Sequence, residues 1–141
     1  MCSSDLDGAG QGVAFDAASG RVFVAIPGLN QLAIVDPIKL NVVGTHLVGA
    51  SPHGVVADNG IVYVTNNRDN YVFVLDAFTL EEKARVPVGR LPEGIDVDPA
   101  RGIVYVANAG EPTLSLIETG KFTVFATLQV APAGLDRKSV V

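Results

Sequence analysis

Short apolar runs separated by turn residues recur along the chain with a period of about 40 residues. Pro-x-Gly triplets stand at residues 52–54, 92–94 and 132–134, and each full repeat contains a valine-aromatic-valine run, at 22–24, 62–64 and 104–106. After the valine-aromatic-valine run, each repeat has a second apolar run that ends in an acidic residue. A last run, in which apolar and polar residues alternate, leads to the next Pro-x-Gly triplet. Length differences between the repeats fall in turns, as expected for a stacked supersecondary unit. The pattern therefore predicts a repeat architecture.

Within one repeat, the pattern predicts four strands. The run 71–75 is apolar throughout, which is typical of a strand covered on both faces, whereas 83–88 alternates and carries Pro87, which suits an outer edge. The expected strands are 54–57, 61–66, 71–75 and 82–88 in the second repeat, and 94–98, 103–107, 113–117 and 122–130 in the third. Four strands per repeat form one blade of a β-propeller.

We therefore expect an all-β fold, a partial β-propeller of about three four-stranded antiparallel blades. The repeats span about 9–50, 51–90 and 91–131, and the triplet at 132–134 opens a fourth. A three-blade arc leaves the outer faces of its end blades bare, and apolar faces of that size favour association. We expect the isolated chain to self-associate.

Both ends of the chain read as translated sequencing adapter. Residues 1–6 match one short-read adapter, and residues 136–141 match the complementary adapter up to its in-frame stop. We interpret both hexapeptides as artefacts, excluded from fold reasoning as a fusion scar would be. Residues 7–135 are then expected to be an internal piece of a longer protein.

Charge and composition exclude several function classes. The net charge is −5 and is unchanged by removing the charged residues of the two ends, so we expect no binding to nucleic acid. No apolar stretch approaches the roughly 18 residues of a membrane-spanning helix. The only cysteine, Cys2, lies in an adapter-like end, which removes disulfide and thiol chemistry.

The tetrapeptide Tyr63-Val64-Thr65-Asn66 resembles the one that names the YVTN family of propeller repeats. The resemblance covers residues 9–134, although the first repeat has Phe23 for the tyrosine and Ile26 for the asparagine. It implies a ring of about seven blades with the strand after Pro-x-Gly innermost. It also implies a secreted, periplasmic or surface protein, mostly bacterial or archaeal, that acts as a binding or scaffold module. Propellers of similar shape include enzymes, so the fold does not decide the function.

The middle residue of Pro-x-Gly changes from repeat to repeat while the scaffold stays constant. It is His53, Glu93 and Ala133, with Gln11 in the corresponding place before Gly12. Histidine and glutamate can bind a metal or act as acid and base. The alternative is that both are solvent-facing loop residues with no joint role.

The loop after the second strand is the other candidate for ligand binding. Its polar run in the second repeat is 66–70, and the third repeat has Asn108 and Glu111. Such residues could bind a sugar, a peptide or a calcium ion, but asparagine and aspartate are also common turn residues. Asp36, Asp76 and Glu118 recur at one position and are interpreted as turn acids.

No compact catalytic signature is present in the sequence. A non-catalytic binding or scaffold propeller is therefore favoured, with no cofactor or metal. The alternative is part of a lactonase-like or quinoprotein-like enzyme with a metal or cofactor in the central channel. We expect the ligand, an unknown small molecule, glycan or protein, to contact one surface at the channel mouth, made of His53, Asn66, Asn67, Arg68, Asp69, Glu93, Asn108 and Glu111.

Overall fold

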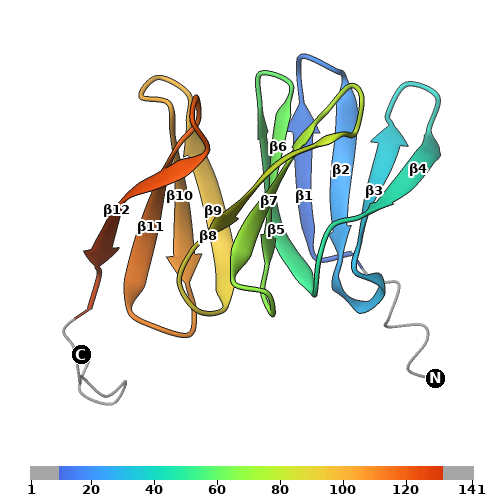
Figure 1. Ribbon diagram of the computed structural model, residues 1–141. Helices are drawn as coiled ribbons and strands as arrows, with labels where there is room; N and C mark the ends of the chain where they lie inside the picture. Colours follow the sequence, from blue (N-terminus) through green and yellow to red (C-terminus); the bar gives the residue numbers. More distant parts are fainter. Residues whose placement is uncertain (1–9, 132–141) are drawn as a thin grey trace.

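The computed structural model describes residues 10–131, which form twelve strands in three four-stranded antiparallel sheets (Figure 1). We call the sheets blades 1, 2 and 3 in chain order. Blade 1 contains β1 (Gly12–Asp16), β2 (Arg21–Ile26), β3 (Gln31–Asp36) and β4 (Asn41–Leu47), with a 3-10 turn, η1 (Pro27–Leu29), after β2. Blade 2 contains β5 (Pro52–Asp58), β6 (Ile61–Asn66), β7 (Tyr71–Asp76) and β8 (Glu82–Pro87). Blade 3 contains β9 (Pro92–Asp98), β10 (Ile103–Asn108), β11 (Thr113–Glu118) and β12 (Thr123–Gln129).

Every strand expected in the second and third repeats is present, with bounds that differ by at most two residues. The largest differences lie at the first strands, which begin at Pro52 and Pro92 rather than at the glycines. In blade 2, Pro52 pairs with Asn66 across an irregular register, so the strand extends beyond a bulge that the sequence pattern does not mark. The two adapter-like ends and the triplet at 132–134 lie outside the described residues.

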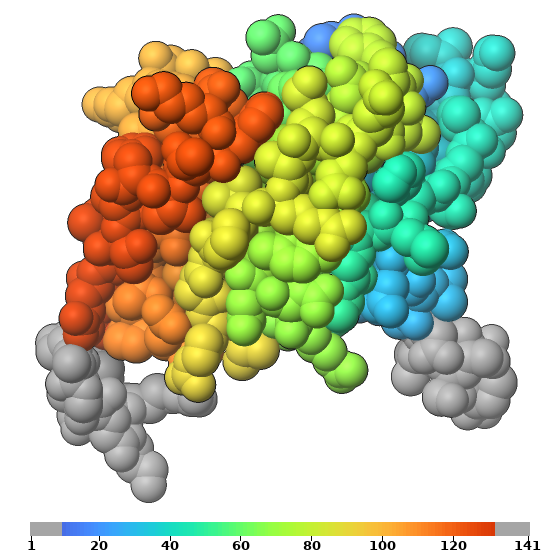
Figure 2. Space-filling model, viewed as in Figure 1, coloured from blue at the N-terminus to red at the C-terminus, as the bar shows by residue number. Residues whose placement is uncertain are grey.

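Each blade is an up-and-down sheet in which consecutive strands pair. The blades stand side by side, and the backbones of β1, β5 and β9 approach one another closely at Gly12 and Gly54. These three strands are therefore innermost, and β4, β8 and β12 lie on the outside, where they cross the face shown in Figure 2. The fold expected from the sequence, an all-β partial β-propeller with three four-stranded antiparallel blades, is confirmed.

The hydrophobic core lies between the blades. Between blades 1 and 2, Phe23 packs with the valines and aromatic residue of the neighbouring sheet, and between blades 2 and 3, Tyr63 occupies the equivalent place. Tyr63 is only 1% exposed, and this burial raises the pKa of its hydroxyl to about 12. The repeat pattern predicts the same burial for Tyr105, but this residue is only half-buried, because it lies on the face of blade 3 that no described blade covers.

The two ends of the blade stack are built differently. At the upper end in Figure 1, polar groups join neighbouring blades: Asp16 accepts a hydrogen bond from the Gly60 amide at 3.0 Å, and Arg21 donates to the Ala77 and Phe78 carbonyls at 2.9 and 3.0 Å. The lower end carries the loops after β2, β6 and β10 and the linkers between blades. No helix among residues 10–131 is long and apolar enough to cross a membrane.

Asp36 and Asp76 are turn acids, as the repeat pattern predicts. Asp36 Oδ1 accepts from the Ile38 and Lys39 amides, and Asp76 Oδ1 accepts from the Phe78 and Thr79 amides, in the same turn of successive blades. These backbone hydrogen bonds lower the pKa of both carboxyl groups below the ordinary value of 3.8. The carboxylate form is therefore favoured by folding.

Acidification should weaken both turns. Because folding lowers the pKa of Asp36 and Asp76, their contribution is complete well above 3.8 and is lost as the pH falls through the lower folded values. The double variant Asp36→Asn, Asp76→Asn keeps oxygen acceptors for the turns but cannot titrate there. Urea unfolding measured from pH 7 to pH 3 should therefore show a shallower loss of stability in the variant, and an unchanged pH profile would contradict this account.

Candidate ligand site at the channel mouth

Three equivalent triplets on the innermost strands line one groove. Residues 11–13, 53–55 and 93–95 lie at the starts of β1, β5 and β9, with Gln11 just before β1, and they bound an open space of about 320 Å³. Gln11 and Glu93 are exposed and His53 is half-buried. The structure thus brings His53 and Glu93 to neighbouring innermost strands on one side of the blade stack, as the sequence predicts.

The imidazole of His53 is held in a defined orientation. Its Nδ1 lies 2.9 Å from the Ser51 carbonyl oxygen, which can only accept, so Nδ1 carries the proton in this contact. The Ser51 hydroxyl lies 3.4 Å from the same nitrogen. In the neutral ring, Nε2 then offers a lone pair, the form in which histidine accepts a hydrogen bond or binds a metal.

A threonine couples the groove to the neighbouring blade. Thr65 Oγ1 accepts from the Gly54 amide at 2.8 Å and donates to the Glu93 carbonyl at 3.0 Å, so it ties the backbones of β5 and β9 together. The Glu93 side chain is left exposed in the groove. The backbone beneath the candidate ligand residues is therefore fixed, while their side chains remain available.

Asn66 and Asn108 hold the linkers that enter their own blades. Asn108 is 2% exposed; its Oδ1 accepts from the Gly89 amide at 3.1 Å, and its Nδ2 donates to Thr113 and Ser115. Asn66 is fully buried, and its Nδ2 donates to the Val48 carbonyl at 3.3 Å. Ligand contact by these two amides stays a prediction, and what the structure shows for them is a place in the linker junctions.

Asp69 and Glu111 serve the same junctions from the surface. Asp69 Oδ2 accepts from the Ala50 amide at 2.8 Å, and Glu111 Oε1 accepts from the Arg90 amide at 3.1 Å. Glu111 also accepts from the Thr113 hydroxyl, and this bond, followed by the one from Arg90, lowers the pKa of the carboxyl. Both carboxylates carry negative charge at the lower end, but each already has backbone or hydroxyl partners.

Asn30 and Asn70 are two further linker residues; the sequence pattern places Asn70 in the polar run 66–70 but predicts a linker role for neither. Their side-chain oxygens accept from the Ser51 and Leu91 amides, each 2.9 Å away, so they hold the linker that leaves their blade. Both adopt left-handed backbone conformations, with φ of 55° and 58°. The signal available in the sequence was an asparagine at one repeat position in two consecutive loops, a residue that tolerates this conformation.

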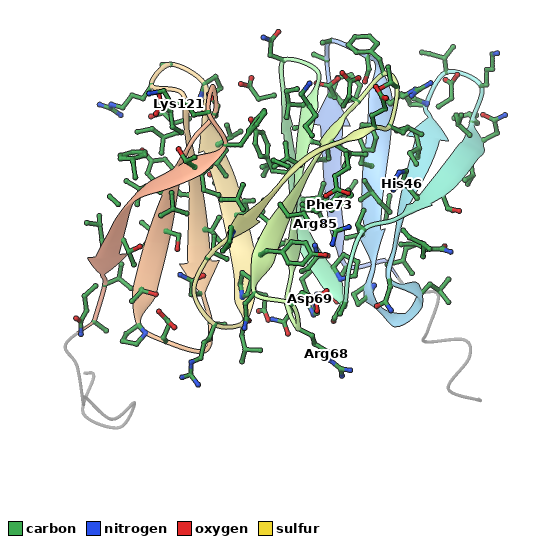
Figure 3. All side chains as sticks on the ribbon, viewed as in Figure 1. His46, Arg68, Asp69, Phe73, Arg85 and Lys121 are labelled. Carbon is green, nitrogen blue, oxygen red and sulfur yellow. The ribbon has the colours of Figure 1, made fainter. Side chains whose placement is uncertain are left out.

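Asn67 and Arg68 complete the lower end. Asn67 is half-buried. Its backbone N–H donates to the Ser51 carbonyl at 2.9 Å, and its side-chain Nδ2 lies 3.4 Å from the Pro92 carbonyl. Arg68 is exposed and extends away from the ribbon beside Asp69 (Figure 3). It lines a second space of about 320 Å³ with Pro27, Gly28, Asn30 and Ser51.

The two spaces share no lining residue, but Ser51 of one and His53 of the other are neighbours at the linker between blades 1 and 2. Ser51 lines the second space and also bonds both His53 and the Asn67 backbone, so His53 and Asn67 lie at the same end of the stack. This arrangement offers hydrogen-bond donors and acceptors of both charges on an open surface. Among residues 10–131 no three histidine, cysteine, aspartate or glutamate side chains are grouped so as to hold a metal ion.

Replacing Asn108 with alanine should destabilise the chain by about 1–3 kcal/mol, because the buried Ser115 hydroxyl and the half-buried Thr113 hydroxyl and Gly89 amide lose this partner. The matched control is Asn67→Ala, which removes one long bond from a half-buried side chain. Urea unfolding of both variants tests the assignment. Equal losses of stability would contradict a structural role specific to Asn108.

No protein-family model matches this chain, and no curated protein sequence does. Solved structures do match. Kuenenia stuttgartiensis hydrazine synthase aligns with a TM-score of 0.80 and 24% identity over 87% of this chain and 36% of its own. Dihydro-heme d1 dehydrogenase NirN, in complex with DHE, aligns at 0.71 and 9% over 86% and 28%, and Kluyveromyces lactis Hsv2 aligns at 0.60 and 9% over 86% and 38%.

These neighbours are β-propeller proteins, and two of them are enzymes. This chain spans between about a quarter and two fifths of their lengths. At such identities the likeness carries the fold and not the activity. Three repeated blades, two inter-blade cores and three propeller neighbours lead to one conclusion: the chain has the fold of a partial β-propeller.

Proposed function

We propose that this chain is a binding or scaffold segment of the YVTN-repeat type, which contacts its ligand at the channel mouth. The observation that carries the proposal is the groove formed by residues 11–13, 53–55 and 93–95. Three repeat-equivalent positions supply an amide, an imidazole and a carboxylate to one surface, while the glycines beside them stay constant. Variation restricted to side chains that share a groove is what recognition of a polar ligand requires.

The ligand class that fits best is a polar molecule or chain segment with several hydrogen-bonding groups, such as a glycan or a peptide. Gln11, His53 and Glu93 together provide donors and acceptors, and Arg68 adds a positive charge at the neighbouring space. The space is open, so affinity would come from many modest contacts rather than from enclosure. By resemblance to YVTN proteins, we place the protein in the periplasm or outside the cell.

An enzymatic role is the second candidate, and the orientation of His53 is the observation that favours it. With Nδ1 bonded to the Ser51 carbonyl, Nε2 of the neutral ring can accept a proton or bind a metal in the central channel. Glu93 on the adjacent strand would be the partner carboxylate. A lactonase-like or quinoprotein-like activity would require further residues from other blades.

The proposal is tested with glycan and peptide arrays probed with the 141-residue chain. The triple variant His53→Ala, Arg68→Ala, Glu93→Ala should lose binding to the compounds that the parent chain retains. The control is Glu81→Ala, Arg101→Ala, which removes one charge of each sign from turns at the opposite end of the blades. Failure to retain any compound, or retention unchanged in the triple variant, would overturn the proposal.

A further inference from the structure

The turn between β5 and β6, at the upper end of blade 2 in Figure 1, consists of two residues only. Asp58 pairs directly with Ile61, and Asn59 and Gly60 between them have φ of 52° and 80°, as a two-residue hairpin turn requires. The equivalent turns of blades 1 and 3 are longer. Asn59 is also the only asparagine in the chain that a glycine follows. Blade 2 therefore places a chemically reactive dipeptide in its tightest turn.

An asparagine followed by glycine can lose its side-chain amide to water. The backbone nitrogen of Gly60, once deprotonated, attacks Cγ of Asn59; a new C–N bond forms, the bond to the side-chain nitrogen breaks, and ammonia leaves. Water then opens the cyclic imide at one of its two carbonyl carbons, which gives aspartate or isoaspartate. Glycine has no Cβ to obstruct the attack. The reaction consumes one water molecule, releases one ammonia molecule and requires no cofactor or oxidant.

The attacking nitrogen is held inside the junction between blades 1 and 2. Gly60 is buried; its N–H donates to Asp16 Oδ1 at 3.0 Å, and its carbonyl accepts from the Ala77 amide at 2.8 Å. The Phe78 ring covers its Cα, since a Cβ there would lie 3.0 Å from Phe78 Cε2. Asn59, in contrast, is exposed. Water thus reaches the side chain that reacts, while the nitrogen that must attack it is occupied.

The residues around this nitrogen oppose its deprotonation and keep it in place. Asp16 is only 1% exposed, and its Oδ2 accepts from the Ser19 amide at 2.9 Å, so the orientation of the carboxylate is fixed. An anionic nitrogen next to this carboxylate would be repelled, whereas the N–H is stabilised by it. Arg21 donates to the Ala77 and Phe78 carbonyls, which holds the covering turn against blade 1. The attack therefore requires the two blades to separate at this end.

We infer that Asn59 is a deamidation site whose rate is controlled by the junction between blades 1 and 2: the closed junction protects it, and local opening exposes it. Isoaspartate adds one carbon to the main chain of a two-residue turn, so Gly60 cannot stay on Asp16 while Asp58 stays paired with Ile61. Either product also adds a negative charge beside Asp58. The modification therefore keeps open the junction whose opening allowed it. The inference is independent of the proposed ligand groove.

The experiment follows deamidation of the 141-residue chain at pH 8 and 37 °C, in native buffer and in guanidinium chloride. Peptide mass spectrometry gives the rate at each asparagine, and labelling by a protein isoaspartyl methyltransferase identifies isoaspartate. In denaturant, Asn59 should react faster than every other asparagine. In native buffer it should react at least about tenfold more slowly, because only molecules with an open junction react. Equal rates in the two buffers, or no reaction of Asn59 in denaturant, would overturn the inference.

Two variants open the junction in different ways. Asp16→Ala removes the partner of the Gly60 N–H and should raise the native rate about tenfold, because a buried hydrogen bond to a charged group is lost. Arg21→Met leaves that partner in place but releases the covering turn, and it should raise the rate by a smaller factor. The control is Arg101→Met, since the Arg101 guanidinium bonds Asp98 within blade 3. A rate that responds to Asp16→Ala but not to Arg21→Met would show that the junction does not control the reaction.

Asn59→Gly confirms the position of the reaction. Glycine adopts the positive φ of this turn but has no amide to lose, so the peptide that contains it should gain no mass. Circular dichroism shows whether each variant is folded. If Asp16→Ala is unfolded, Asp16→Asn takes its place; it retains an oxygen acceptor without the charge and should give a smaller acceleration. Folded junction variants that deamidate at the rate of the parent chain would contradict the inference.

Discussion

Truncation of Tyr63 to alanine should cost about 3–5 kcal/mol of unfolding free energy, the range for replacing a large buried aromatic side chain. Tyr63 is 1% exposed and packs with Val104, Val106 and Ile117 across the junction of blades 2 and 3. Its removal therefore leaves a cavity in the interface itself rather than within one sheet. Blades stabilise one another through these interfaces. In the variant, blade 3 should therefore unfold separately from blade 2.

Tyr105→Ala is the matched control. It removes the same side chain from the equivalent position, but from a half-buried site on the face of blade 3 that no described blade covers. The cost should be clearly smaller than for Tyr63, which is 1% exposed. Urea unfolding followed by circular dichroism measures both. Equal costs would show that the inter-blade core does not determine the stability of the chain.

Gly54→Ala should destabilise the chain by about 3 kcal/mol, the upper part of the range for overpacking. A Cβ at Gly54 would lie against the backbone oxygen of Glu93, well inside van der Waals contact, and 2.8 Å from Ile95 Cγ2. A backbone carbonyl cannot turn aside as a side chain does, so β5 and β9 would have to separate. The Thr65 bridge between them, at 2.8 and 3.0 Å, would lengthen with them.

Gly94 offers the control for this second effect. It ends the same Pro-x-Gly triplet one blade later, yet a Cβ there meets only Ala107 Cβ at 3.6 Å, an ordinary contact. Gly94→Ala should therefore be close to neutral, because no described blade packs against this part of β9 from the other side. Thermal unfolding of the two variants side by side checks the comparison, and a neutral Gly54→Ala would show that the innermost strands are not in tight contact.

The strands could be predicted because the same pattern of apolar runs and turns occurs independently in each repeat. The valine-aromatic-valine runs and the fully apolar run at 71–75 are compatible only with buried strands. In blade 2 the structure shows both as buried strands, β6 and β7. The same pattern predicts that Tyr105 is buried like Phe23 and Tyr63, but it is only half-buried, because burial depends on a neighbouring blade and not on the residue's own repeat. The alternation of residues along a strand determines which face a side chain occupies. The neighbouring blade determines whether that face is buried.

The polar loops show why the candidate site was harder to predict than the strands. A row of asparagines and acids is compatible with ligand binding and with turn formation. Whether Asn66 and Asp69 are available depends on the linker 48–51, which is separate from them in sequence and occupies both. The placement of His53 and Glu93 did not depend on a linker. They occupy the same position in successive repeats, which predicts neighbouring places on the innermost strands, and they line one space.

The turns that carry Leu40, Leu80 and Phe122 have a further consequence. All three residues adopt left-handed backbone conformations, with φ of 57°, 66° and 54°, which cost a bulky residue roughly 1–2 kcal/mol. In blades 2 and 3 the side chain so directed is covered by the preceding blade, which offsets that strain. Blade 1 carries the strain with Leu40 in solvent. Fraying should therefore be directional: the arc opens first at its N-terminal blade, and each later blade is held closed by the one before it.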